Sequence, residues 1–461
     1  MEGSGRETSP RDEGFSACGV DWRPKGGSYE VVRDARARWT LPARMLAATP
    51  VPMLAALTPG YIALYVVGVL LWLQALLKLL ALPFSGRAVG ANDPDLWPRY
   101  TVLVPLYRER DSLPRLLLGL SGLDYPADRL QILLVCEADD HETLDALPEL
   151  SAPFELVRVP DGGPRTKPKA LRVAMARASG EIVTIYDAED VPHPAQLKCA
   201  ARALLADPAL AAVQAPLRVD NLHPGWITRQ FAMEYASLFY AWVPALARAG
   251  VAVPLGGTSN HIRRTALEAA GGWDPFNVTE DADLSFRLAL APDCRFGWIS
   301  LPTEEEAVAS FRAWRHQRTR WFKGFAQTWL AHMRRPFAGS WRRWAALHVT
   351  IGLTLLSALL HLPTLFLLAA LLGTGIDVPM GITLAGAAFY SSGILVAAVA
   401  SRRAGLVLRF RDLATLPLYW ALLTWPAWAA LWDLVRRPSY WHKTAHGVSA
   451  RMPFPEHVAA E

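Results

Sequence analysis

Two patterns of hydrophobic and polar residues alternate along the chain. Four long apolar runs could each cross the hydrocarbon core of a bilayer: 61–83, 345–372, 377–400 and 412–435. A weaker run over 43–58 is interrupted by two prolines and could form the first arm of a helical hairpin that turns at 58–60. These runs predict membrane helices on both sides of a central region with a different character.

The central region, 85–340, contains short apolar runs typical of buried β-strands: 101–106, 131–137, 155–159, 181–187 and 211–215. Apolar residues recur at helical spacing between them, over 111–122 and 167–178. This alternation predicts β-α-β units and therefore an α/β domain with a mostly parallel, doubly wound sheet. Ligands of such sheets bind beyond the carboxyl ends of the strands, so we expect the chemistry just after each run.

Basic residues predict how the membrane segments are oriented. The loop at 402–411 and the chain after 436 are rich in arginine, and such segments favour the cytosolic side. Three full crossings after the central region would put that region and the tail on opposite sides. Segment 345–372, which contains His361 and Pro363, therefore either lies partly in the interface or makes two short passages.

The chain thus divides into five expected parts, listed in order: a disordered tail over 1–40, a membrane helix or hairpin over 41–84, a cytosolic domain over 85–340, membrane helices over 341–436 and a basic tail over 437–461.

Composition agrees with a membrane-bound protein. Apolar residues make up 52% of the chain, and many of its 18 tryptophans lie at the ends of apolar runs, as in an interfacial belt. The net charge of +5 is modest, and the basic residues gather near the apolar runs, so we expect lipid headgroups rather than nucleic acid as partners. The four cysteines are scattered without metal-binding spacing, which favours a reducing, cytosolic setting.

Carboxylates follow two of the predicted strands. One cluster comes directly after 131–136 and another after 181–186; their members are Glu137, Asp139 and Asp140, and Asp187, Glu189 and Asp190. Several carboxylates at the end of an apolar strand are unfavourable unless a cation lies among them. A hard divalent ion such as Mg²⁺ or Mn²⁺, together with a bound diphosphate, would provide that cation. The alternative for either cluster alone is a solvated loop or a helix cap.

Two helix starts add candidate residues. Lys167 and Lys169 begin a predicted helix, where cations beside the backbone N–H groups suit an anionic ligand, although an ordinary basic turn would look the same. Thr279 is a plausible N-cap followed by Glu280 and Asp281. One of these carboxylates could act as a general base, or the segment could simply be a well-capped helix.

A basic and aromatic segment over 314–324 precedes the later membrane runs. On a helix, Gln317, Arg320 and Trp321 share one face, where a guanidinium could hold a diphosphate and an indole could stack on a sugar ring. The alternative is a juxtamembrane helix whose basic side chains reach lipid headgroups. The three glutamates at 304–306 are expected to lie in a solvated loop.

In this order and spacing, the motifs resemble those of the processive family 2 glycosyltransferases, which include bacterial cellulose synthase, chitin synthase and hyaluronan synthase. The resemblance covers about residues 98–330. Residues 279–281 match the family's TED motif, and residues 317–321 match its Q-x-x-R-W motif. The chain is most similar to cellulose-synthase-like proteins, which implies a GT-A-type fold for the cytosolic domain, flanked by transmembrane α-helices.

The resemblance also implies roles for the donor-side residues. Glu137 and Asp139 would meet the nucleotide base and ribose, and Lys167 and Lys169 would lie near the uracil and phosphates. Metal ligands would be Asp187 and Glu189, with Asp190 as a further candidate because the family has Asp where this chain has Glu189.

The remaining implied roles concern the chemistry and the acceptor. Asp281 would be the general base, and Gln317 and Arg320 would hold the diphosphate. The acceptor would contact four residues: Trp321, Gly257, Thr258 and Glu280. As the alternative to a solvated loop, the glutamates at 304–306 could border this acceptor site.

The implied activity is inverting transfer from a nucleotide diphosphate sugar, expected to be a UDP-sugar, to a growing β-linked polysaccharide. The enzyme would be a multi-pass protein of the inner membrane, with envelope export subunits as possible partners. An alternative is transfer of one sugar to a lipid carrier or glycolipid. A nucleotide-binding scaffold or transporter is disfavoured, because the membrane runs carry few charges: Lys78, Asp377 and Asp433 near their ends, and His361 within one.

Overall fold

The computed structural model describes residues 60–84, 92–162, 165–223, 225–375 and 378–437. Expectations for the tail over 1–40, the hairpin arm over 43–58 and the chain after Arg437 lie outside these residues. All five predicted strands are present, as β1 Tyr100–Leu106, β2 Leu130–Glu137, β3 Phe154–Val159, β4 Ile182–Ile185 and β6 Leu210–Gln214.

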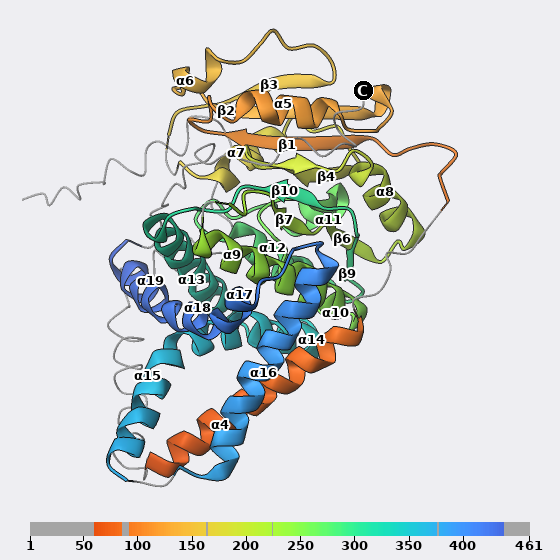
Figure 1. Ribbon diagram of the computed structural model, residues 1–461. Helices are drawn as coiled ribbons and strands as arrows, with labels where there is room; N and C mark the ends of the chain where they lie inside the picture. The colour runs from red at the N-terminus through yellow and green to blue at the C-terminus, as the bar shows by residue number, and fades with distance from the viewer. Residues whose placement is uncertain (1–59, 85–91, 163–164, 224, 376–377, 438–461) are drawn as a thin grey trace, which may run out of the picture.

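The strands form a seven-stranded sheet of order β3-β2-β1-β4-β8-β6-β9 (Figure 1). The first four are parallel, as expected for a doubly wound fold, and the last pair, β6 and β9 Arg295–Trp298, is also parallel. The sequence pattern did not predict β8 Asn260–Arg263, which lies antiparallel between β4 and β6. The described domain is therefore α/β with a mostly parallel central sheet.

Side chains alternate between two faces of the central sheet. Val102 packs on one face with helices α5 Leu113–Ser121 and α8 Gln196–Ala206, which contribute Leu116 and Leu197 to the same core. Leu103 points to the other face, where α7 Lys167–Met175 contributes Leu171. Burial of both faces stabilises the fold by about 25 cal/mol for each Å² of apolar surface that is removed from water. Both helix-spaced patterns between the strands thus correspond to helices.

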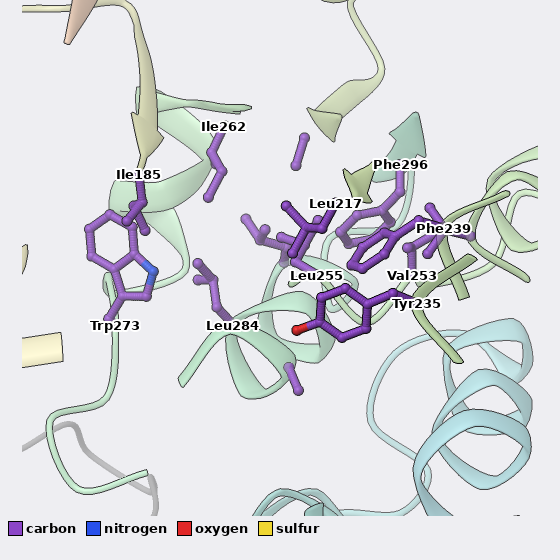
Figure 2. Packing of buried hydrophobic residues seen from close by; sticks show 14 of the residues in the cluster. Ile185, Leu217, Tyr235, Phe239, Val253, Leu255, Ile262, Trp273, Leu284 and Phe296 are labelled. Carbon is purple, nitrogen blue, oxygen red and sulfur yellow. The ribbon is translucent and has the colours of Figure 1, made fainter. Parts of the chain in front are cut away.

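The second face also carries the helices that complete the site. Figure 2 shows Ile185 at the end of β4, Tyr235 from α9 Trp226–Ser237, and Leu284 from α12 Glu280–Leu288 packing into one apolar cluster. Because these helices share a core with β4, their polar ends are held in fixed positions relative to the strand end.

A small second sheet corrects one expectation. Strand β10 Thr303–Glu305 lies between β5 Val191–Pro192 and β7 Leu217–Val219. The three glutamates at 304–306 are buried here, so the prediction of a solvated loop was wrong. An ion pair with Arg218 compensates the buried charge of Glu304.

Two described helices are long and apolar enough to cross a membrane by length and composition: Trp341–Gly373 and Met380–Arg403. The first comprises α14 Trp341–Ala346, the π-helical turn η5 Leu347–Gly352 and α15 Leu353–Gly373, and the second is α16. Helix α4 Gly60–Ala81 packs along α16, and its apolar part, Tyr65–Ala81, is shorter. Figure 1 shows α4, α15 and α16 projecting from the same side of the α/β domain.

Segment 345–372 lies in one continuous helix, which excludes the alternative of two short passages. Pro363 lies inside the helix and lacks the N–H that would bond the carbonyl four residues earlier. That carbonyl, of Leu359, accepts a hydrogen bond of 3.1 Å from the indole of Trp428 instead. The indole of Trp428, on another helix, therefore replaces the backbone donor that Pro363 lacks, and the helix continues without a break.

Segment 412–435 is not a single spanning helix, contrary to expectation. It forms three short helices, α17 Phe410–Ala414, α18 Leu416–Leu422 and α19 Thr424–Arg436, of which α19 packs along α13 Phe311–Met333. The described residues after the domain thus contain two candidate spans rather than three. An even number of spans is compatible with the expectation that domain and tail lie on the same side of a membrane.

The remaining described elements are short, and their bounds are η2 Leu82–Phe84, η3 Ala127–Arg129, α6 His141–Leu144, η4 Leu238–Trp242, α10 Val243–Arg248 and α11 Arg264–Ala269.

Candidate active site

A cavity of about 800 Å³ lies beyond the carboxyl ends of the parallel strands. It collects predicted site residues from separate parts of the chain: Glu137, Lys167, Asp187, Glu189, Gly257, Thr258, Glu280, Asp281, Gln317, Arg320 and Trp321. Three other predicted residues, Asp139, Lys169 and Asp190, are not among those that line it. Side chains that are far apart in sequence thus share one cleft.

Lys167 connects the two halves of the acidic site. Its ammonium donates hydrogen bonds to a carboxylate oxygen of Asp187 and, over 2.8 Å, to the carbonyl of Gly257. A methyl group added to Gly257 would lie 3.7 Å from the Lys167 ammonium and 3.6 Å from Oδ2 of Asp281. The strand-end carboxylate Asp187 and the helix-start carboxylate Asp281 therefore approach the same ammonium from different elements.

Burial and mutual charge determine the protonation of this group. Burial by itself would lower the pKa of Lys167, but Asp187 and Glu280 outweigh it and raise the pKa, so the ammonium stays charged. Burial, followed by repulsion from Asp281, raises the pKa of Glu280 to about 7. Burial also raises the pKa of Asp281. A carboxylate with a raised pKa is a stronger base than a solvated one, which suits proton abstraction.

Asp190 supports the turn after β4 from behind the cavity. Its Oδ2 accepts hydrogen bonds from the backbone N–H of Asp187, at 2.6 Å, and from the hydroxyl of Thr258. Asp190 is fully buried, whereas Glu189 lines the cavity. These contacts give Asp190 a positioning role for Asp187 and Thr258, and they make Glu189 the better placed of the two candidate metal ligands.

The side chains of the site supply only some of the ligands that a divalent ion needs. Asp187 and Glu189 provide the hard oxygen ligands that Mg²⁺ and Mn²⁺ prefer. Among the described residues, no group of three or more His, Cys, Asp or Glu side chains surrounds one point as a metal site. Further ligands would have to come from a bound diphosphate and water.

The first acidic cluster is held by Lys169. Its ammonium lies 3.4 Å from Oε2 of Glu137 and donates to the carbonyls of Pro160 and Gly162, at 2.9 and 2.8 Å. Lys169 thereby positions Glu137, which lines the cavity. Asp139 instead forms an ion pair with Arg165, itself a cavity residue, at the outer edge.

Helices α12 and α13 meet at a glycine. A methyl group on Gly324 would lie 2.3 Å from Oγ1 of Thr279, so only glycine allows this approach. Thr279 occupies the N-cap position of α12, as predicted, but its hydroxyl forms no capping hydrogen bond. Side chains of α13 fix the same junction, because Gln327 accepts from the backbone N–H of Val278 at 3.2 Å. The close contact places the start of α12 against the helix that carries Arg320.

We expect Gly324→Ala to lower both stability and catalysis. The added methyl group must push α13 away from Thr279, at a cost of about 1–3 kcal/mol of folding free energy, and a displacement of about 1 Å can reduce turnover about 100-fold. Thermal unfolding and donor turnover of the purified variant measure the two effects. Gly381→Ala is the matched control, since no atom lies within 4 Å of its added methyl group. Equal behaviour of the two variants would contradict the role assigned to this contact.

The predicted shared face of α13 is present, since Gln317, Arg320 and Trp321 all line the cavity. The indole of Trp321 stacks on Tyr235 with ring centroids 6.1 Å apart and planes inclined by 11°. Arg318 is 1% exposed and pairs with Glu234 at 2.5 Å. A helix whose basic side chains simply reach lipid headgroups does not account for these contacts.

Sequence reasoning gave one group of the site only as an alternative and missed another. Glu305 lines the cavity and accepts a hydrogen bond of 3.4 Å from Tyr235. Glu234 accepts a second hydrogen bond, of 2.5 Å, from the hydroxyl of Tyr419 on α18. Neither group belongs to a sequence motif, and the run of glutamates at 304–306 looked typical of a solvated loop.

Comparison with known proteins shows that the domain is similar to glycosyltransferases. Residues 98–324 match the family model described as glycosyltransferase like family 2. The chain is 30% identical over 270 residues to a beta-monoglucosyldiacylglycerol synthase of Synechocystis, covering 57% of this chain and 55% of the relative. It is 28% identical over 239 residues to a probable glycosyltransferase, YdaM, of Bacillus subtilis, covering 49% and 55% of the two chains.

A third relative is a cellulose synthase catalytic subunit of Komagataeibacter sucrofermentans, 28% identical over 248 residues, with 51% of this chain and 32% of the relative covered. The chain spans about half or less of the length of these curated relatives. A solved mannosyltransferase from Pyrobaculum calidifontis, in complex with GDP-Man and Mn²⁺, aligns with a TM-score of 0.55 and 22% identity over 81% of this chain and 96% of its own. This likeness confirms a GT-A-like fold.

Proposed function

We propose that this chain, whose residues 98–324 match the model of a glycosyltransferase family, transfers a sugar from a nucleotide diphosphate sugar to an acceptor held at a membrane. One observation carries the proposal. The strand-end carboxylate Asp187, the helix-start carboxylate Asp281 and the cation Arg320 line a single cavity. A base, a diphosphate-binding cation and a positioning aromatic ring are what displacement at an anomeric carbon requires.

In the proposed mechanism, Asp281 accepts the proton of the acceptor hydroxyl. The oxygen then attacks the anomeric carbon as the bond to the diphosphate breaks on the opposite face, so the configuration inverts. Arg320 and Lys167 stabilise the charge that develops on the leaving diphosphate. A divalent ion bound by Asp187 and Glu189 would supply further positive charge at the same oxygens. A UDP-sugar remains the expected donor, with Glu137 at the nucleotide.

The acceptor has two candidate classes. A growing β-linked polysaccharide is supported by the Q-x-x-R-W segment and by Trp321, whose ring can pack on a terminal sugar. A lipid-borne acceptor is supported by the wall of the cavity, which continues between the apolar helices α4, α15 and α16. Either class places the enzyme at the bilayer, as expected for a multi-pass inner-membrane protein with its domain in the cytosol, and only a polymer would call for export subunits.

A donor screen with product sizing tests the proposal. Membranes containing the full chain are incubated with radiolabelled UDP-sugars and a GDP-sugar, with Mg²⁺, Mn²⁺ or a chelator. We expect one donor to be consumed and its sugar to appear either in polymer or in a single species that partitions into organic solvent. Absence of nucleotide release and of labelled product with every donor would contradict the proposed function.

A further inference from the structure

The cavity has a second polar end, distant in sequence from the catalytic carboxylates. Gln74 and Lys78 of α4 and His361 of α15 line this end, where the cavity lies between the apolar helices. Aliphatic and aromatic side chains line the cavity between its two ends, among them Leu238, Phe322, Phe325, Val349 and Val396. A molecule that filled the cavity would therefore contact polar groups at both ends and hydrocarbon between them.

Lys78 is the charged group of this second end. Its ammonium lies 3.7 Å from the ring centroid of Phe389, 5.3 Å from that of Trp420 and 3.5 Å from the carbonyl of Phe389. Among the described residues the Lys78 ammonium forms no ion pair with a carboxylate, and the ring of the nearby His361 is hydrogen-bonded to the hydroxyl of Tyr390 at 2.8 Å. A cation among apolar helices is costly without a counter-charge, and aromatic faces offset only part of that cost.

An apolar groove continues from this end between α4 and α15. It shares Gln74, Ser357 and His361 with the cavity, and it is otherwise lined mainly by leucines of the two helices, including Leu70, Leu71, Leu356 and Leu360. In the most apolar stretch of Trp341–Gly373, only 6% of the residues are buried within the protein. Figure 1 shows α4 and α16 side by side, with α15 descending separately from the domain. Hydrocarbon chains in the groove would thus be continuous with the surrounding lipid.

We propose that the acceptor is a lipid with a phosphate group, which pairs with Lys78 while its hydrocarbon lies in the groove between α4 and α15. The headgroup beyond the phosphate extends through the cavity, so that its hydroxyl reaches Asp281. This inference rests on the proposed function and narrows its acceptor class. A neutral glycolipid would leave Lys78 without a counter-charge, and a polysaccharide would find few hydrogen-bond partners along the apolar wall.

Photolabelling of the full chain in dodecyl maltoside micelles tests the inference. The two probes, a phosphatidylglycerol and a diacylglycerol, carry the same diazirine-bearing acyl chain. We expect the phosphatidylglycerol to label residues of α4 and α15, and Lys78→Met to reduce this labelling about tenfold or more. Lys78→Arg should retain most of it, because the charge remains. Lys198→Met, which removes a lysine paired with Asp124 on the domain surface, should change nothing.

Equal labelling by both probes, or phosphatidylglycerol labelling that is unchanged in Lys78→Met, would overturn the inference and leave Lys78 as a cation held by aromatic rings and the C-terminal end of α4. Unlabelled phosphatidylglycerol, which carries hydroxyls beyond its phosphate, should compete more strongly than phosphatidic acid, which carries none; equal competition would contradict the placement of the headgroup in the cavity. Because labelling needs no sugar donor, a chain that labels but transfers no sugar would refute the proposed function alone. A chain that transfers sugar without Lys78-dependent labelling would refute the inference alone.

Discussion

Asp281→Asn is expected to reduce sugar transfer by about 1000-fold while leaving nucleotide affinity nearly unchanged. The amide keeps the size of the side chain but cannot accept the acceptor proton, and a positioned general base contributes about 100-fold to 10,000-fold. The contacts that position Glu137, the residue expected at the nucleotide, come from Lys169 and not from Asp281, so donor binding should largely persist. Turnover of the identified donor and calorimetric titration with UDP measure the two quantities separately.

The control for this variant is Glu268→Gln, which removes an exposed carboxylate that pairs with Arg264 on α11. It should transfer sugar at the rate of the unmodified protein. If Asp281→Asn transferred sugar at that same rate, another residue would have to be the base and the proposed mechanism would be wrong.

The pH dependence of the unmodified enzyme follows from the same carboxyls. Burial raises the pKa of Asp281, and burial together with Asp281 raises the pKa of Glu280 to about 7. Since the deprotonated form of Asp281 is the base, kcat/KM should fall as the pH drops, and this fall should begin at a higher pH than for a solvated carboxyl, whose pKa is near 4. The acid limb of the profile therefore lies closer to neutrality than that of an exposed aspartate.

The parallel half of the fold could be predicted because its signal is local. Strands such as β1 and β2 are buried on both faces and therefore read as uninterrupted apolar runs. Strand β8 gives no such signal, because its four residues include Asn260, His261 and Arg263. His261 is buried through a 2.6 Å hydrogen bond to Tyr100, and burial lowers its pKa to about 3, so the ring stays neutral. Only the tertiary partner makes this polar segment a central strand.

The membrane region shows the limit of hydropathy. Segments 377–400 and 412–435 have similar apolar content, but the second contains Pro417 and Pro426 and is broken into short helices. Its exposed tryptophans, Trp425, Trp428 and Trp432, suit an interfacial position beside α13. Length and apolarity alone do not distinguish an apolar run that forms one long helix from a run that forms several short ones.

The candidate site, like the fold, could be predicted only in part from the sequence. Motif spacing predicted that Asp187, Asp281 and Arg320 would converge, and all three line one cavity. The contacts that hold them could not be predicted, because they depend on packing between distant helices. The approach of Gly324 to Thr279 is one such contact, and the pairing of Arg318 with Glu234 is another.

Arg320→Met is expected to lower kcat about 100-fold to 1000-fold, because removing one preorganised group that stabilises developing charge has effects of this size. Arg320 lines the cavity near Glu280 and Asp281, whose charges oppose the lowering of its pKa by burial. Arg320→Lys should retain part of the activity, since an ammonium keeps the charge but lacks the planar fork that binds two phosphate oxygens. Turnover and KM for the donor are measured for both variants.

A second readout separates an electrostatic role from a structural one. The charge of Arg320 lowers the pKa of both Glu280 and Asp281, so its removal raises them. The acid limb of the pH profile should therefore move to higher pH in Arg320→Met and stay nearly in place in Arg320→Lys. Arg312→Met, on an exposed position of the same helix, is the control and should shift neither rate nor profile. Loss of activity with an unshifted pH profile would mean that Arg320 acts only by holding α13 in place, and the leaving-group role would fall.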